Sequence, residues 1–177
     1  MRTKWLGVLA VTAAVLFGAS MVGAQPPKSS LASGDVTFVK NAGEGSKAEV
    51  ELGQLAQQKA SNDQVKQFGQ RMVQDHGKAA KELTELAANK GVSVPNEVHR
   101  AHQRSRDRLA RLQGAAFDKA YMKEMVKDHT KDAAEFRKAS QNAKDPDVKA
   151  WAGKTLPTIE EHLKVAQDLE KQLAASR

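Results

Sequence analysis

The sequence contains no cysteine and only a few aromatic residues, and it has no long apolar run beyond its amino-terminal end. Without cysteine the chain cannot form disulfides, thiolate zinc sites, iron–sulfur clusters or a thiol nucleophile. It must therefore hold any metal ion with imidazole or carboxylate groups. The Gly-x-Ser-x-Gly, Walker-type and His-Glu-x-x-His motifs are also missing, which argues against the enzyme classes that carry them. The 177 residues are enough for one domain with its own core.

The amino terminus has the features of a secretory signal. Arg2 and Lys4 precede an apolar run over residues 6–22, and the small residues before Ala24 favour cleavage after that position. We expect a signal peptide over residues 1–24, a linker over 25–34 and one helical domain over 35–175. Export would place the protein in the periplasm or in association with the outer membrane. The alternative is that the run is retained as an anchor, and no transmembrane span is expected after cleavage.

Apolar residues recur at spacings of three and four along the rest of the chain, and strand-like alternation is nearly absent. This pattern predicts helices over residues 35–60, 61–91, 96–112, 115–142 and 146–173. Ser61 is expected to cap the second helix, Gly114 to end the third and Asp145 to cap the last. Four long helices of similar length, with a long connection that carries a short helix, predict an all-α, ferritin-like four-helix bundle with a crossover helix.

Two of these helices share a motif that ends in histidine. Residues 72–76 read Met-Val-Gln-Asp-His, and residues 125–129 read Met-Val-Lys-Asp-His. His76 and His129 each follow a core-facing methionine by four residues, so both imidazoles should face the core. His162 has an equivalent place in the last helix. Counting from the turns at about 1.5 Å per residue puts the three histidines, and Glu49 of the first helix, at similar heights in the bundle.

Core-facing histidines allow two interpretations. They could bind a metal ion together with Glu49, while Asp75 and Asp128 accept hydrogen bonds from the ring nitrogens that do not bind. Imidazole suits a divalent transition metal such as zinc, iron or copper. Alternatively, the histidines are structural and hydrogen-bond flanking carboxylates. Di-iron oxidase chemistry is disfavoured, because ferritin-like di-iron sites use Glu-x-x-His and the positions three before each histidine here are apolar.

Much of the net positive charge lies in the predicted crossover helix. Spacings of four, four and three would place one set of its arginines on a single face: Arg100, Arg104, Arg108 and Arg111. This stripe could bind an anionic surface of the cell envelope or a protein partner, or it could simply be solvated. Nucleic acid is not an expected partner, because no aromatic residue is interleaved there for base stacking.

Several segments together resemble a bacterial family of exported proteins that share a domain of unknown function. They are the Ala-Glu-Val-Glu-Leu-Gly run from Ala48, the two Met-Val-x-Asp-His segments, the run from Gly114 to Tyr121, and the Thr-Leu-Pro run from Thr155 followed by His162. Members of this family are often labelled outer-membrane proteins. The resemblance covers about residues 38–169 and implies an exported protein with a ferritin-like helical bundle. It implies no particular reaction or cofactor.

Two hypotheses for function follow. In the first, the protein is a non-catalytic binding or structural module of the cell envelope, and its histidines stabilise the bundle. In the second, it binds or buffers a metal ion through His76, His129 and His162. Neither hypothesis requires an enzyme.

Overall fold

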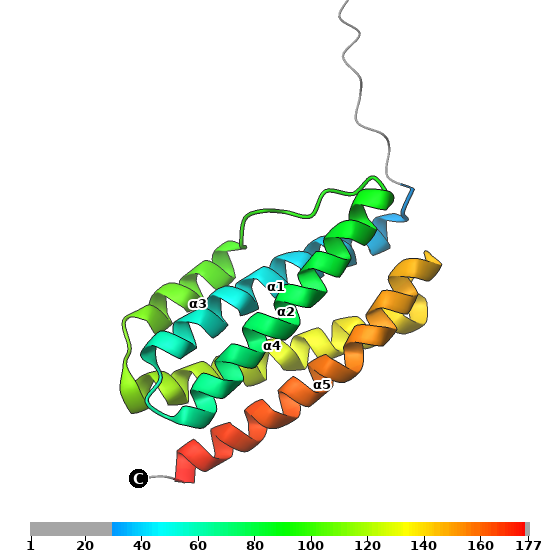
Figure 1. The fold of residues 1–177 in the computed structure, drawn as a ribbon. Coiled ribbons are helices and arrows are strands. Elements are labelled where there is room, and N and C mark those ends of the chain that lie inside the picture. The colour runs from blue at the N-terminus through cyan, green and yellow to red at the C-terminus, as the bar shows by residue number, and fades with distance from the viewer. Residues whose placement is uncertain (1–29, 176–177) are drawn as a thin grey trace, which may run out of the picture.

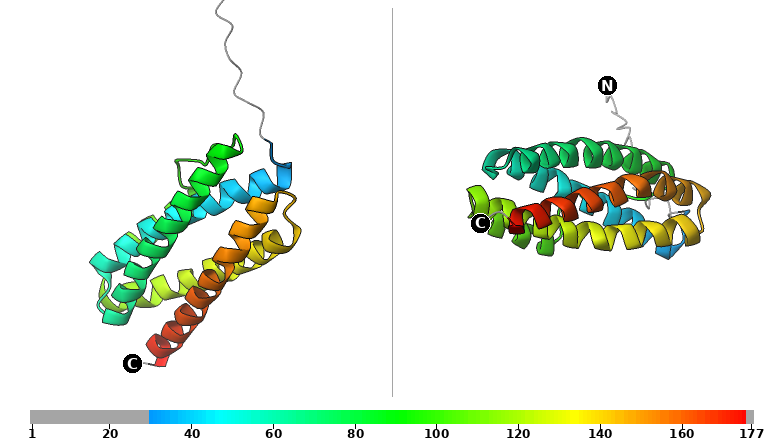
Figure 2. Two further views of the ribbon diagram at one scale, coloured as in Figure 1. Left: turned by 45° about the vertical axis from the view of Figure 1, so that its right-hand side comes forward. Right: turned by 90° about the horizontal axis from the view of Figure 1, so that it is seen from below.

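The computed structural model describes residues 30–175, which form five α-helices. They are α1 (Ser33–Lys59), α2 (Asp63–Asn89), α3 (Arg100–Ala110), α4 (Gly114–Asn142) and α5 (Pro146–Ala175). α1 and α2 form one antiparallel hairpin and α4 and α5 form a second, while the segment before α3 returns along the bundle (Figure 1, Figure 2). The predicted all-α four-helix bundle with a short crossover helix is confirmed. The predicted signal peptide lies outside the described residues.

The helix ends follow the sequence closely, with two corrections. Asn62, not Ser61, caps α2, because its side chain accepts hydrogen bonds from the amides of Gln64 and Val65. Gly114 does not end α3; it has a φ of 59° and begins α4. The predicted cap of α5 is present, since Oδ1 of Asp145 accepts hydrogen bonds from two amides in the first turn.

A carboxylate on each hairpin binds the turn of the other. Asp35, at the start of α1, accepts hydrogen bonds from the amides of Lys144 and Asp145 at 3.0 and 2.8 Å. Asp118, at the start of α4, accepts them from the amide and hydroxyl of Ser61 and from the amide of Asn62. Both carboxylates are buried, so these bonds are shielded from water. They fix the height of one hairpin relative to the other.

The core consists of two apolar clusters separated by a polar layer. One cluster includes Leu83, Phe136 and Ile159, and the other includes Met72 and Met125. The histidines lie where one cluster gives way to the other along α2, α4 and α5. Buried polar groups therefore gather at mid-bundle, where each needs a partner.

α1 and α2 approach closely at two glycines. A Cβ atom on Gly53 would lie 2.5 Å from the carbonyl oxygen of Gly69, and one on Gly69 would lie 2.8 Å from the carbonyl oxygen of Gly53. Only residues without a side chain allow this separation. Neither helix, nor any other in the described part of the chain, is long and apolar enough to cross a membrane.

Candidate metal centre

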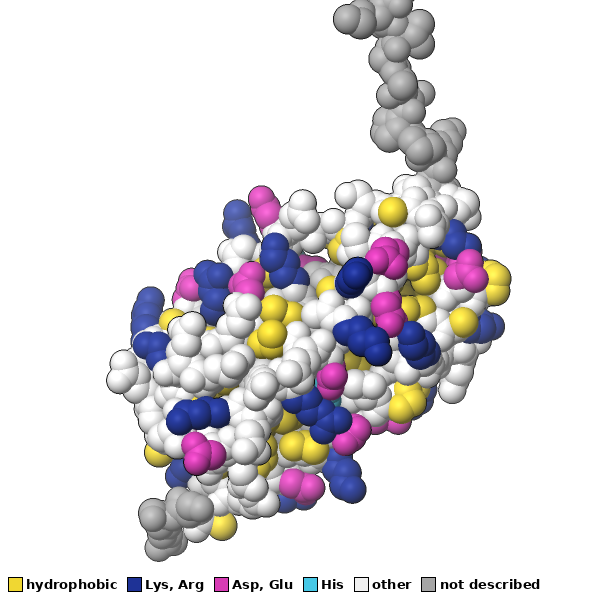
Figure 3. Space-filling view, viewed as in Figure 1, with side chains coloured by type: hydrophobic (Ala, Val, Ile, Leu, Met, Phe, Trp, Pro, Cys, Tyr) yellow, Lys and Arg dark blue, Asp and Glu magenta, His cyan; other side chains and the backbone are white. Residues whose placement is uncertain are grey.

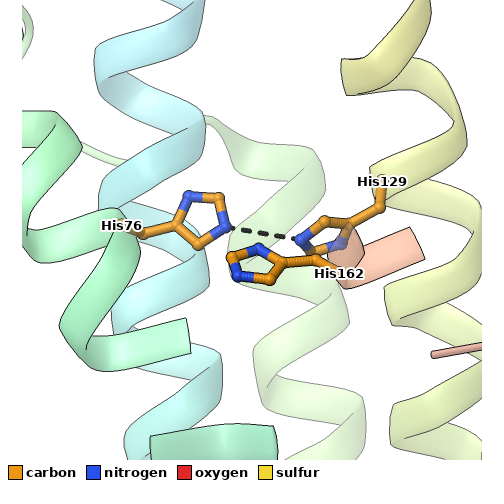
Figure 4. Close-up of side chains that lie close together, drawn as sticks. All are labelled: His76, His129 and His162. Carbon is orange, nitrogen blue, oxygen red and sulfur yellow. Dashed lines mark hydrogen bonds between the residues drawn. The ribbon is translucent and has the colours of Figure 1, made fainter. Parts of the chain in front are cut away.

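Three buried histidines from three helices meet in the polar layer. His76 comes from α2, His129 from α4 and His162 from α5, and their ring centroids are 5.4–5.5 Å apart. One ligand atom from each lies within 4.8 Å of those from the other two. Each is at most 3% exposed, and Figure 4 shows the three rings facing one another. We refer to these residues as the histidine triad.

A backbone carbonyl fixes the tautomer of His129. Its Nδ1 lies 3.0 Å from the carbonyl oxygen of Met125, one turn earlier in α4. Because a carbonyl oxygen can only accept, Nδ1 must carry the proton. In the neutral ring, Nε2 then has a free lone pair, and this atom points towards His76.

A carboxylate fixes the tautomer of His162 in the opposite sense. Its Nε2 donates to Oδ2 of Asp75 on α2 at 2.8 Å. The proton on Nε2 leaves a lone pair on Nδ1, which is buried and has no hydrogen-bond partner among the described residues. Phe68 packs edge-on against both His129 and His162, at 6.4 and 6.3 Å between ring centroids, and limits rotation of the rings.

The separation of the first two rings fits a shared ion. Nε2 of His76 and Nε2 of His129 are 3.3 Å apart. Two nitrogens bound to one tetrahedral ion at roughly 2.0–2.1 Å are about 3.4 Å apart. Without an ion, His76 must donate to His129, because the latter has no proton on Nε2. To bind an ion through Nε2, His76 would carry its proton on Nδ1 instead.

Burial keeps all three imidazoles neutral at neutral pH. It lowers the pKa of His129 to about 3 and the pKa of His76 well below its ordinary value, and charge repulsion between the rings adds to both effects. Burial also lowers the pKa of His162, although the hydrogen bond to Asp75 acts in the opposite direction. Neutral imidazole is the form that binds metal ions.

The carboxylates named from the sequence have different surroundings. Asp75 accepts a hydrogen bond from His162. Asp128 is not the partner of His129, whose Nδ1 donates to the carbonyl oxygen of Met125. Glu49 is not part of the group of close ligand atoms. Both Glu49 and Asp128 have one buried carboxylate oxygen without a hydrogen-bond partner among the described residues.

These two acids belong to a second group that sequence reasoning missed, on α1 and α4: Glu49, Glu124, Asp128 and Asp132. Burial, with repulsion from the other acids, raises the pKa of Glu49 and Asp128 and raises that of Asp132 to about 7. Glu124 accepts from Ser105 and Lys127 and is paired with Arg108. The helical spacing of four between Glu124, Asp128 and Asp132 could have indicated a common face.

The arginines of α3 do not form an uninterrupted free stripe. All four arginines named from the sequence are exposed, but Arg108 is paired with the buried Glu124. Arg106 is paired with Glu51 and Asp107. On the face shown in Figure 3, basic and acidic side chains are interspersed.

Comparison with known proteins supports the fold and gives no reaction. A family model described as a domain of unknown function, DUF4142, matches residues 20–169. No curated protein matches the chain.

Three solved structures have a similar fold. A DUF305 fragment from Deinococcus radiodurans has 11% identity and a TM-score of 0.71, covering 80% of this chain and 98% of that one. A DUF305 protein from Streptomyces coelicolor, thought to be secreted, has 13% identity and a TM-score of 0.69, with coverages of 80% and 93%. CopM in its Cu(II)-bound form has 17% identity and a TM-score of 0.67, with coverages of 78% and 96%. At these identities the likeness shows a shared fold alone.

Proposed function

The chain belongs to the DUF4142 family, a domain of unknown function, and we propose that it binds one divalent transition-metal ion through the histidine triad. The triad offers three imidazole nitrogens and leaves a fourth position open. Three histidines with an open position form a familiar arrangement for zinc, and the same nitrogens suit copper.

One observation carries this proposal. Two of the three rings have their tautomers set from outside, His129 by the Met125 carbonyl and His162 by Asp75, so that each presents a lone pair to the centre. Metal-binding histidines are typically held in this way by a partner on the other nitrogen. If the triad were purely structural, the buried Nδ1 of His162 would remain an unpaired acceptor, which costs stability.

Cu²⁺ is the first ion to test. Among divalent first-row ions it binds nitrogen ligands most tightly. CopM, which has a similar fold, was solved with Cu(II) bound. No thiolate is available to favour another ion, because the chain has no cysteine.

Binding, buffering or transfer of the ion suits this site better than catalysis. All three ligands are buried, and Phe68 packs against two of them. The Glu-x-x-His carboxylates of a di-iron oxidase are absent as well.

We further propose that the protein is exported and works in the periplasm or at the outer membrane. The amino-terminal sequence predicts a cleaved signal, and one protein of similar fold is thought to be secreted. Sequencing the amino terminus of protein recovered from a periplasmic fraction tests this. A terminus at Gln25 is expected, and a retained Met1 in the membrane fraction would support the anchor instead.

Metal stoichiometry and affinity test the site. The purified protein is stripped with chelator, titrated calorimetrically with Cu²⁺ and with Zn²⁺, and its metal content is measured after dialysis. We expect one ion per chain. Loss of the hydrogen-bond partner of a metal ligand lowers affinity roughly 10- to 100-fold. His129→Asn and His162→Asn remove a ligand itself, so each should weaken binding by more than this.

His99→Asn is the matched control. His99 is an exposed histidine that caps α3 through Nδ1, and asparagine can cap in the same way. This variant should bind the ion like the unsubstituted protein. If the unsubstituted protein binds no ion stoichiometrically, or if His99→Asn loses binding while the triad variants keep it, the proposal is wrong and the structural interpretation of the histidines stands.

A further inference from the structure

A cavity of about 320 Å³ leads from the surface to the histidine triad. Its inner part is lined by His76, by Ala42 and Ser46 of α1 and by Phe136 of α4. Its outer part is lined by residues of α3 and the residue before it: His99, Ala101 and His102. His76 is the triad member that this cavity reaches.

The cavity lies at one of the two seams between the hairpins. α1 packs mainly against α2, and α4 mainly against α5, so the α1–α4 seam and the α2–α5 seam both have few direct contacts. The side chains that α1 presents there are small, including Ala42, Gly45 and Ser46. α3 contacts both α1 and α4 and covers part of the opening.

The lining is acidic. Glu44, Asp132 and Glu135 contribute carboxylates. The basic side chains beside them are Lys131, which is 65% exposed and lies 3.7 Å from Glu135, and the imidazole of His102, which is hydrogen-bonded to Glu44 at 2.8 Å. Burial and the neighbouring acids raise the pKa of Asp132 to about 7. Burial is the largest cause of this shift, and repulsion from Asp128 and Glu135 adds to it, so several acids lie close together at this cavity. A group of acids attracts cations.

The opposite side of the triad is closed by ion pairs. Asp75, which accepts from His162, is also held by Arg71 at 3.3 Å, and Arg71 binds Glu161 at 2.9 Å. A cation approaching from the α2–α5 side would meet this guanidinium first.

We propose that the acidic cavity between α1, α3 and α4 is the path by which a divalent cation reaches and leaves the histidine triad, with Asp132 and Glu135 as the groups that hold the ion on the way. This inference rests on the proposed metal site. In this proposal α3 covers part of the path.

Blocking the path tests it. Gly45 lines the cavity, and a Cβ atom added there would meet open space, so Gly45→Leu should fold normally and fill the opening. Gly77→Leu is the matched control, because Gly77 is an exposed helical glycine with equal space that does not line the cavity. Binding of Cu²⁺ alone is followed by stopped flow, and its release by competition with excess chelator.

An obstacle on the path of the ion should change the association and dissociation rate constants by a similar factor. Gly45→Leu is expected to slow association and dissociation at least about 10-fold each, while the dissociation constant, which is their ratio, stays within about threefold. Gly77→Leu should change neither rate. Asp132→Asn should slow both rates about threefold or more, again at nearly constant affinity, since removing one charge weakens the attraction felt by a cation in transit.

Other outcomes overturn the inference. If Gly45→Leu binds Cu²⁺ at an unchanged rate, the cavity is not the path. If Arg71→Ala also accelerates binding, the path lies on the α2–α5 side. If Asp132→Asn weakens affinity solely by faster release, Asp132 is a ligand and not part of a path. If the unsubstituted protein binds no ion, the proposed function and this inference are both wrong. If Gly45→Leu and Asp132→Asn bind the ion with normal affinity and unchanged rates, only this inference is wrong.

Discussion

Asp75 on α2 binds His162 on α5, at 2.8 Å between Oδ2 and Nε2, and not its own neighbour in the sequence, His76. The carboxylate thus joins the two hairpins and sets which nitrogen of His162 faces the triad. Its other contact, to Arg71, lies on the outer side of the bundle. The repeated Asp-His motif therefore uses its two aspartates differently, because Asp128 in the second copy packs among other acids.

Replacing Asp75 should weaken metal binding without removing a ligand. An asparagine in Asp75→Asn can donate to Nε2 of His162 and so favour the tautomer with the proton on Nδ1, which blocks that lone pair. We expect a loss of about 10- to 100-fold in Cu²⁺ affinity, measured by calorimetry. Arg71→Gln is the control: it removes the ion pair to Asp75 but keeps the bond to His162, and its affinity should stay near that of the unsubstituted protein. Equal affinity for Asp75→Asn would show that Asp75 does not orient the ring.

The metal-free protein should lose stability as the pH falls below about 6.5. The folded chain keeps His129 neutral down to about pH 3, whereas the unfolded chain binds a proton on this ring below about 6.5. Protons therefore favour the unfolded state across this window, by up to about 1.4 kcal/mol per pH unit for each such imidazole. Urea unfolding from pH 7 to 4 should show a shallower decline for His129→Gln than for the unsubstituted protein. Parallel pH profiles would show that His129 is not held neutral by burial.

The helices could be predicted from sequence because their apolar residues repeat at helical spacing, and this spacing also placed His76, His129 and His162 on inner faces. Which residues then touch depends on the rotation and height of each helix, which packing between helices decides. Asp75 was expected to assist from a flank, but its reach to α5 follows from how α2 and α5 face each other. Glu49 is predicted at the height of the triad by counting residues, but its carboxylate lies near the acids of α4.

Removing the charge of Asp132 should stabilise the protein at high pH. The pKa of this group is raised to about 7 in the folded chain and lies near 3.8 when unfolded, so its ionisation costs stability as the pH rises between these values. Asp132→Asn should be more stable than the unsubstituted protein by up to about 4 kcal/mol at pH 8, and the difference should nearly vanish at pH 4. Thermal unfolding at the two pH values measures this. Asp168→Asn, at an exposed position on α5, should show no such change.

A methyl group at the closest approach of α1 and α2 should disturb the triad from a distance. In Gly53→Ala the new Cβ would lie 2.5 Å from the Gly69 carbonyl oxygen and 3.0 Å from Cβ of Met72, so α2 must move away. Overpacking of this kind costs roughly 1–3 kcal/mol of stability.

Because His76 follows Met72 by one turn, that movement should also widen the 3.3 Å gap to His129 and weaken Cu²⁺ binding. Gly77→Ala is the matched control. Its Cβ meets nothing, so it should stabilise α2 by about 0.5–1 kcal/mol through helix propensity and leave affinity unchanged. Urea unfolding and calorimetry on both variants separate the two effects. If Gly53→Ala lost stability but bound the ion normally, the spacing of α1 and α2 would not control the position of His76.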